Sequence, residues 1–148
     1  VMDFANWQEV NFTAEELTNP TVSAAGSNPD GDGMTNLEEF LFGGNPKTHN
    51  ENIEPLQAHI QNLDLGNGLR DFAFLEVRLN RAAGRSVNWQ LLTSTDGETW
   101  TSAETIITPL ENTDIGSGME LRRYRVKDSV PDADARTRLF KIESMLSN

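Results

Sequence analysis

Side chains that carry oxygen recur at alternate positions in one short stretch, and this spacing constrains the chain more than any other feature. The stretch covers residues 28–39 and reads Asn-Pro-Asp-Gly-Asp-Gly-Met-Thr-Asn-Leu-Glu-Glu. A twelve-residue loop that wraps a hard cation needs oxygen donors at positions 1, 3, 5, 7, 9 and 12. Those six positions fall on the side chains or, at position 7, on the backbone carbonyl of the following residues: Asn28, Asp30, Asp32, Met34, Asn36 and Glu39.

The other positions of this stretch also suit a calcium loop. Gly33 falls at position 6, where the chain must turn sharply, and Glu39 at position 12 can supply a bidentate carboxylate. Asn36 would bind directly or through a water molecule. We therefore predict one Ca²⁺ ion, which takes six to eight oxygens at roughly 2.3–2.6 Å. The alternative is a plain Asp-Gly turn before a helix, with Thr35 as the helix cap.

The predicted site should be a weak one. Position 1 is Asn28 rather than Asp, so the loop offers three formal negative charges instead of four. We expect an affinity in the range of extracellular modules, about 10⁻⁴–10⁻³ M. Pro20 and a stretch of small residues separate the loop from the preceding helix, so a regulatory opening of a helix pair is not expected.

Two short helices are predicted around this loop. Thr13 and Glu16 have the spacing of a capping box, and Pro20 is expected to end the helix that they begin. A second helix is expected from about Thr35 to Phe42, because its apolar residues fall on one face.

The pattern changes to β beyond residue 50. Turn residues separate candidate strands at intervals typical of a sandwich. The expected strands are Leu56–Leu63, Phe72–Leu79, Ser86–Thr93, Thr105–Thr108, Glu120–Val126 and Thr137–Glu143. The sequence therefore predicts a mainly β chain, with a helix–calcium loop–helix segment at 1–50 and an antiparallel β-sandwich at 51–148.

The segment 28–46 resembles a calcium module near the C-termini of exported proteins of Verrucomicrobia and Planctomycetes. The same loop chemistry is similar to dockerin and thrombospondin type 3 repeats. The β part resembles the domain that follows in those bacterial proteins, through Arg81–Gly84, Ser94–Trp100 and a last strand like Arg138–Ile142. The resemblance implies an accessory role outside the cell. A dockerin has two calcium loops and only one is visible here, which argues against cohesin binding.

Charge and composition exclude several partners. The net charge is −11, and nearly all of it lies in residues 1–65, which hold eleven acidic residues and the single basic residue Lys47. Nucleic acid is therefore not expected as a partner, because phosphate binding needs a basic face. No stretch approaches the roughly 20 apolar residues of a membrane span. The chain opens on Val1, so we expect a piece of a longer protein, and its lack of cysteine excludes disulfides and thiolate metal sites but not secretion.

Other candidate sites have structural interpretations as well. Trp89, Trp100 and Tyr124 could form a platform for a polysaccharide, although aromatic residues usually belong to a core. Asp96 lies in a stretch close to the Asp-box of sialidase propellers, where a hairpin turn is the simpler interpretation. His49 and His59 lack the spacing of a zinc site. No nucleophile elbow is present, and nothing singles out a glycosidase carboxylate pair among the many acids.

Five arginines gather near the last two strands: Arg122, Arg123, Arg125, Arg136 and Arg138. We expect them to face solvent or a sheet edge and to pair with nearby acids. The alternative is that they dock onto the acidic helical part or a neighbouring domain.

The sequence favours a non-catalytic, calcium-binding structural or interaction module of a secreted or cell-surface bacterial protein. Calcium would stabilise its fold and set its orientation against an upstream domain of the same chain. The alternative function is a carbohydrate-binding module attached to a secreted hydrolase.

Overall fold

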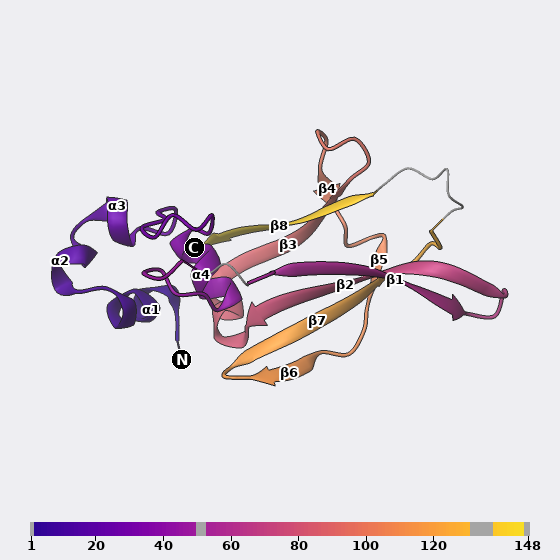
Figure 1. Cartoon of the computed structure of the whole chain (residues 1–148), viewed down its shortest axis with the longest axis horizontal. Coiled ribbons are helices and arrows are strands. Elements are labelled where there is room, and N and C mark those ends of the chain that lie inside the picture. Colours follow the sequence, from indigo (N-terminus) through magenta and orange to yellow (C-terminus); the bar gives the residue numbers. More distant parts are fainter. Residues whose placement is uncertain (1, 50–52, 131–137, 147–148) are drawn as a thin grey trace.

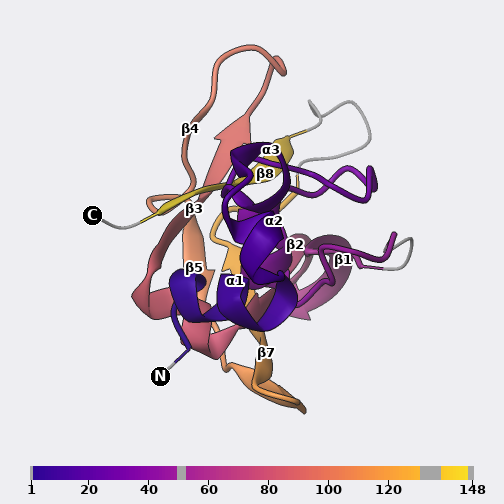
Figure 2. The same cartoon turned by 90° about the vertical axis from the view of Figure 1, so that its left-hand side faces the viewer.

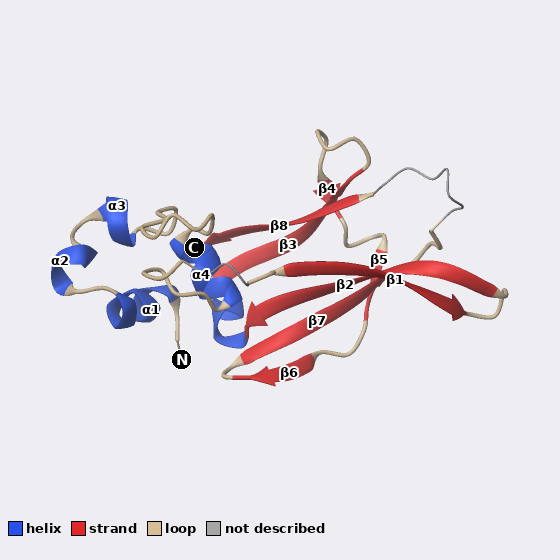
Figure 3. Cartoon of the chain, viewed as in Figure 1, coloured by secondary structure: helices blue, strands red, loops and turns tan. Residues whose placement is uncertain are grey.

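The computed structural model describes residues 2–49, 53–130 and 138–146. Helices gather at one end of the molecule, and strands extend away from them (Figures 1 and 3). The helices are α1 Phe4–Asn11, α2 Ala14–Leu17, α3 Pro20–Ser23 and α4 Asn36–Phe42, and a 3₁₀ helix, η1, covers Arg81–Arg85. The strands are β1 Leu56–Asp64, β2 Leu69–Asn80, β3 Val87–Ser94, β4 Thr101–Ser102, β5 Ile107–Pro109, β6 Thr113–Gly116, β7 Met119–Val126 and β8 Leu139–Leu146. The chain is mainly β, as the sequence predicts.

The strands form two antiparallel sheets. The first has the order β1-β2-β7-β5, with β6 also paired to β7, and the second has the order β4-β3-β8. The long pairings are regular: β1 and β2 match from Leu56 opposite Val77 to Asp64 opposite Leu69. Strand β7 therefore lies inside its sheet, so of the two positions expected for its arginines, solvent or a sheet edge, the edge is excluded.

The helical segment begins with capping side chains, as expected. Thr13 and Glu16 form the predicted capping box of α2. Pro20 does more than end this helix: it is the first residue of α3, with Asn19 as the cap. Proline favours that position because the first helical N–H has no partner within the helix. Helix α1, which Asp3 caps, was not singled out by the sequence pattern.

The helices and both sheets share one apolar core. Phe40 and Leu41 of α4 are fully buried and belong to the same cluster as Leu75 and Val77 of β2 and Leu91 of β3. Side chains of the large sheet also bind the end of this helix, since Arg78 Nε donates to the Phe42 carbonyl at 3.2 Å. The position of α4 is therefore fixed by the β part, while the division of the chain at residue 50 stays a prediction.

Candidate metal centre

The loop 28–39 lies between α3 and α4 and folds on itself through short-range hydrogen bonds. Asn28 Oδ1 accepts from the Gly31 N–H at 2.9 Å, and Asp32 Oδ1 accepts from the Met34 N–H at 2.9 Å. Gly33 adopts a φ of 95°, a left-handed conformation that favours glycine and produces the sharp turn expected at position 6. These contacts draw the side chains of alternate residues toward the inside of the loop.

The base of the loop is closed by two backbone hydrogen bonds. The Asn36 N–H donates to the Ser27 carbonyl at 2.7 Å, and the Leu37 N–H donates to the Ala25 carbonyl at 3.0 Å. Leu37, at position 10, is buried in the core. The entering chain and the first turn of α4 are thus held side by side.

Helix α4 begins where the sequence predicts. Thr35 caps it, and Glu38 completes the capping box by accepting from the Thr35 N–H at 2.8 Å. Glu38 is thereby used by the helix, while the next residue, Glu39, is turned inward and is only 1% exposed. Two adjacent glutamates therefore have different roles.

Three carboxylates meet inside the loop. One oxygen from each of Asp30, Asp32 and Glu39 lies within 4.8 Å of the others, a grouping that could hold a metal ion. Like charges this close repel one another, and burial removes the water that would screen them. A cation between them would offset both costs.

Two oxygens in this region are buried and accept no hydrogen bond from the part of the chain that is described. They are Asp30 Oδ2 and Asn36 Oδ1. Asn36 is completely buried, and its amide nitrogen donates to the carbonyls of Val22 and Ala24, both at 2.8 Å. Those two carbonyls fix which end of the amide is nitrogen, because a flipped amide would place oxygen against oxygen. The Asn36 oxygen is therefore left without a donor in a buried place, which is unfavourable unless something binds it.

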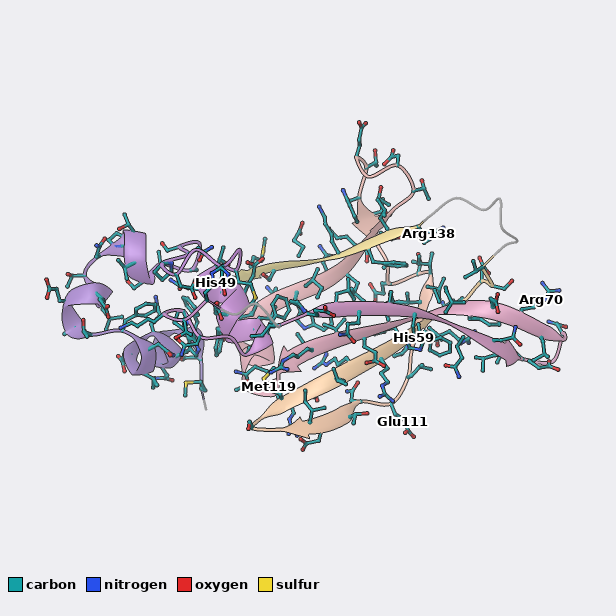
Figure 4. The ribbon with its side chains drawn as sticks, in the orientation of Figure 1. His49, His59, Arg70, Glu111, Met119 and Arg138 are labelled. Atoms are coloured by element: carbon teal, nitrogen blue, oxygen red, sulfur yellow. The ribbon has the colours of Figure 1, made fainter. Side chains whose placement is uncertain are left out.

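The structure thus brings three of the six predicted ligands together as an acidic group and leaves a fourth with an unsatisfied oxygen. Asn28 and the Met34 carbonyl belong to the same loop, and their roles as ligands stay predictions. His49 and His59 do not join this group; one lies beside α4 and the other on β1 (Figure 4). Sequence spacing alone did not reveal that the Asn36 amide is held by hydrogen bonds to the segment before the loop.

The stretch Ser94–Trp100 is a turn, as the simpler interpretation holds. Asp96 Oδ1 accepts from the N–H groups of Glu98 and Thr99 at 2.9 and 2.8 Å. These bonds stabilise the turn that connects the paired strands β3 and β4. Hydrogen bonds from Thr99 and then from Glu98 lower the pKa of Asp96 to about 2. The carboxylate is used by its own backbone, which accounts for this motif without catalysis.

Two of the three arginines of β7 pair with acids, as expected. Arg122 Nε lies 2.8 Å from Glu120 Oε1, and Arg123 Nε lies 3.5 Å from Glu76 Oε1. Arg136 lies outside the described residues.

Comparison with models of known protein families, with curated proteins and with solved structures finds no match. The resemblance to the calcium modules of exported bacterial proteins therefore stays a prediction. Among the described residues, no helix combines the length and the apolar character needed to cross a membrane.

Proposed function

We propose that the loop 28–39 binds one Ca²⁺ ion and that this ion stabilises a non-catalytic accessory module. The proposed ligands are Asn28, Asp30, Asp32, the carbonyl of Met34, Asn36 and Glu39. The observation that carries the proposal is the pair of buried oxygens, Asp30 Oδ2 and Asn36 Oδ1, to which none of the described residues donates a hydrogen bond. They belong to positions 3 and 9 of the loop, and a cation bound to both would offset the cost of their burial.

The donor set favours calcium over other metals. Every proposed ligand is an oxygen, from carboxylates, carboxamides and a carbonyl, and neither histidine takes part. Zinc and copper prefer nitrogen or sulfur donors, and magnesium keeps several waters in a strict octahedron. A loop that supplies six oxygens from alternate residues suits the larger and more adaptable Ca²⁺ shell.

The ion would act on the whole molecule through α4. Glu39 is the last ligand of the loop and also lies in the middle of this helix, whose neighbours Phe40 and Leu41 are fully buried. Binding of the ion to the folded loop alone stabilises the folded chain by mass action. A weak site of this kind suits millimolar calcium outside the cell, which supports a secreted or cell-surface location.

The β part then serves as a rigid body attached to the calcium segment. We infer that the two sheets pack face to face as a sandwich, since β2 and β3 contribute Leu75 and Leu91 to one core cluster. Ca²⁺ would fix the orientation of this body relative to an upstream domain of the same parent chain. Nothing in the chemistry of the loop calls for turnover of a substrate.

Scanning calorimetry of the chain in EDTA and in 10 mM CaCl₂ tests the proposal. With a dissociation constant of about 10⁻⁴–10⁻³ M, calcium should add about 1.4–2.7 kcal/mol to the free energy of unfolding. This corresponds to a rise in Tm of about 3–10 °C. Replacement of the last ligand, Glu39→Gln, should abolish the rise.

The neighbouring substitution Glu38→Gln is the matched control. Glutamine also serves at the third position of a capping box, so this variant keeps the helix cap and removes the same charge one residue away. It should keep the calcium-dependent rise in Tm. A rise that is lost in Glu38→Gln and kept in Glu39→Gln would show that the ligand register is wrong.

A further inference from the structure

A groove opens between the two sheets on the side of the molecule where both have short edge strands. It has a volume of about 630 Å³, which lies within the range of about 300–1,000 Å³ typical of ligand sites. Trp89 of β3 forms one wall, and Tyr124 of β7 lines it from the other sheet. Strands β4 and β5, which run along the same side as β3 in Figure 2, cover only two and three residues. Because these edges are short, the groove is open to solvent.

Charged side chains on the inner face of β7 lie beside these two rings. Arg122 and Tyr124 lie opposite Val77 and Leu75, which are fully buried in the core, so they share the face turned toward the other sheet. The Arg122 guanidinium lies 5.5 Å from the centre of the Trp89 ring and forms an ion pair with Glu120, which is only 8% exposed.

This network gives the groove a fixed shape. Burial raises the pKa of Tyr124, and the neighbouring Arg122 guanidinium partly offsets the increase. Arg122 therefore contacts both aromatic walls, and the buried Glu120 carboxylate holds Arg122 in place. The pair lies at the border of the core, since the Arg122 side chain is 35% exposed, and it holds the guanidinium beside the aromatic rings of the open site.

The remaining lining indicates the chemistry of a ligand. Ser102, Thr108 and Gln90 offer hydrogen-bonding groups, and Glu104 and Lys127 contribute one charge of each sign. Aromatic faces beside hydroxyl and amide groups suit a ligand with an apolar face and a hydroxylated edge, which is the character of a pyranose ring. A lining with one charge of each sign gives no excess of positive charge for an anionic ligand.

The edge of the groove disfavours a peptide strand as the occupant. Strand β5 ends in Pro109, which has no N–H to donate, and β4 is only two residues long. Addition of a strand needs a row of free backbone donors and acceptors along an edge. Neither edge beside the groove supplies one.

We propose that the groove between β3, β5 and β7 binds a neutral polysaccharide, with Trp89 and Tyr124 contacting the sugar rings. Of the three aromatic residues that the sequence suggests as a platform, the structure brings these two together. Trp100 does not line the groove; the Lys141 Nζ atom lies 4.3 Å from the centre of its ring. The proposal is independent of the metal site, because none of the calcium ligands lines the groove.

Affinity electrophoresis in gels that contain one neutral polymer each tests the proposal, with xylan, soluble β-1,3-glucan, hydroxyethyl cellulose and galactomannan as probes. The full chain should be retarded by at least one polymer, both in calcium and in EDTA. Ser102→Trp places a large side chain at the groove without removing any core residue, and it should abolish the retardation. Thr101→Trp is the matched control, since Thr101 is an equally exposed neighbour on β4 that does not line the groove.

Titration calorimetry with an oligomer of the retarding polymer then locates the binding site. Trp89→Ala should weaken binding by about tenfold or more, because it removes a stacking face. Trp100→Ala should leave it unchanged. The inference is overturned if no neutral polymer retards the chain, if only anionic polymers do, or if Ser102→Trp binds as well as Thr101→Trp. If calcium does not raise Tm but the chain still binds the polymer, only the proposed metal site is rejected.

Discussion

Gly44 and the carboxylate of Glu39 occupy adjoining space. A Cβ atom placed on Gly44 would overlap Glu39 Oε2 and come within 2.6 Å of its carboxyl carbon. The Gly44 N–H also donates to the Glu39 carbonyl at 2.8 Å, so the chain turns back over the helix directly after α4. The absence of a side chain at Gly44 allows the last proposed ligand to point into the loop.

Gly44→Ala should therefore displace the Glu39 carboxylate. We expect calcium binding to weaken by about 10–100-fold, the usual effect of disturbing a residue that orients a ligand. The φ of Gly44 lies outside the left-handed region, so alanine meets a steric obstacle there rather than backbone strain. Titration calorimetry with CaCl₂ measures the change.

Gly26→Ala is the control for that substitution. Gly26 also lies in a loop beside the metal centre, and a Cβ atom there meets nothing within 4 Å. Its calcium affinity should equal that of the unmodified chain. Equal affinities for Gly44→Ala and the unmodified chain would mean that Glu39 does not bind the ion.

Asn36→Asp separates the two roles of Asn36. The substitution keeps an oxygen at position 9 and adds a negative charge, but it removes the amide donors to the Val22 and Ala24 carbonyls. In EDTA the free energy of unfolding should fall by about 1–3 kcal/mol for each carbonyl left unsatisfied. In CaCl₂ much of this loss should be recovered, because a fourth carboxylate strengthens calcium binding. Urea unfolding in both buffers measures the difference.

A matched charge change distinguishes this effect from a general one. Asn67→Asp adds the same charge in the turn between β1 and β2, far from the loop. It should alter stability by less than about 0.5 kcal/mol and leave the calcium response as it was. If Asn36→Asp gains no more stability from calcium than Asn67→Asp, then Asn36 is a structural residue only.

The local parts of this structure could be predicted from the sequence. The apolar spacing after Thr35 predicted α4 nearly to the residue. Regular alternation predicted β3 and β7, because side chains on a strand alternate between faces. Strand β6 was missed, since it is short and its pairing with β7 contains a bulge between Asp114 and Gly116. Short elements of this kind depend on their neighbours for stability.

Relationships between distant segments could not be predicted in this way. The spacing in 28–39 identified the acidic ligands. Nothing in the sequence indicated that the Asn36 amide donates to the Val22 carbonyl, or that Gly44 leaves room for the Glu39 carboxylate. Arg122 was expected to face solvent or a sheet edge, and it lies instead on the inner face of β7, where it pairs with Glu120. Register between strands decides which face a side chain takes, and a single sequence does not supply it.

Acid should weaken the turn at Asp96. The folded chain holds the pKa of Asp96 at about 2, below its ordinary value of 3.8, so the ionised form is bound more tightly in the folded state. This stabilisation is fully present above pH 3.8 and is lost as the pH falls toward 2. In EDTA, Asp96→Asn should reduce the fall in Tm between pH 5 and pH 2. Glu111→Gln, which removes an exposed acid, serves as the control, and an equal change in both variants would contradict the role given to Asp96.

The calcium segment and the β part should unfold together, because α4 packs in the single core that they share. Phe40 is fully buried, and its ring lies 5.8 Å from the ring centres of both Phe4 and Trp7 of α1. At the end of the helix, Met119 of β7 packs so closely on Gly43 that a Cβ atom there would approach its sulfur to 2.8 Å. Phe40→Ala should therefore lower the free energy of unfolding of the whole chain by about 3–5 kcal/mol. Leu17→Ala, at a position that is 37% exposed, should change it by about 0.5 kcal/mol.

Scanning calorimetry should show a single transition whose calorimetric and van't Hoff enthalpies agree, with and without calcium. Two separate transitions, of which Phe40→Ala moves only one, would mean that calcium stabilises the helical segment alone.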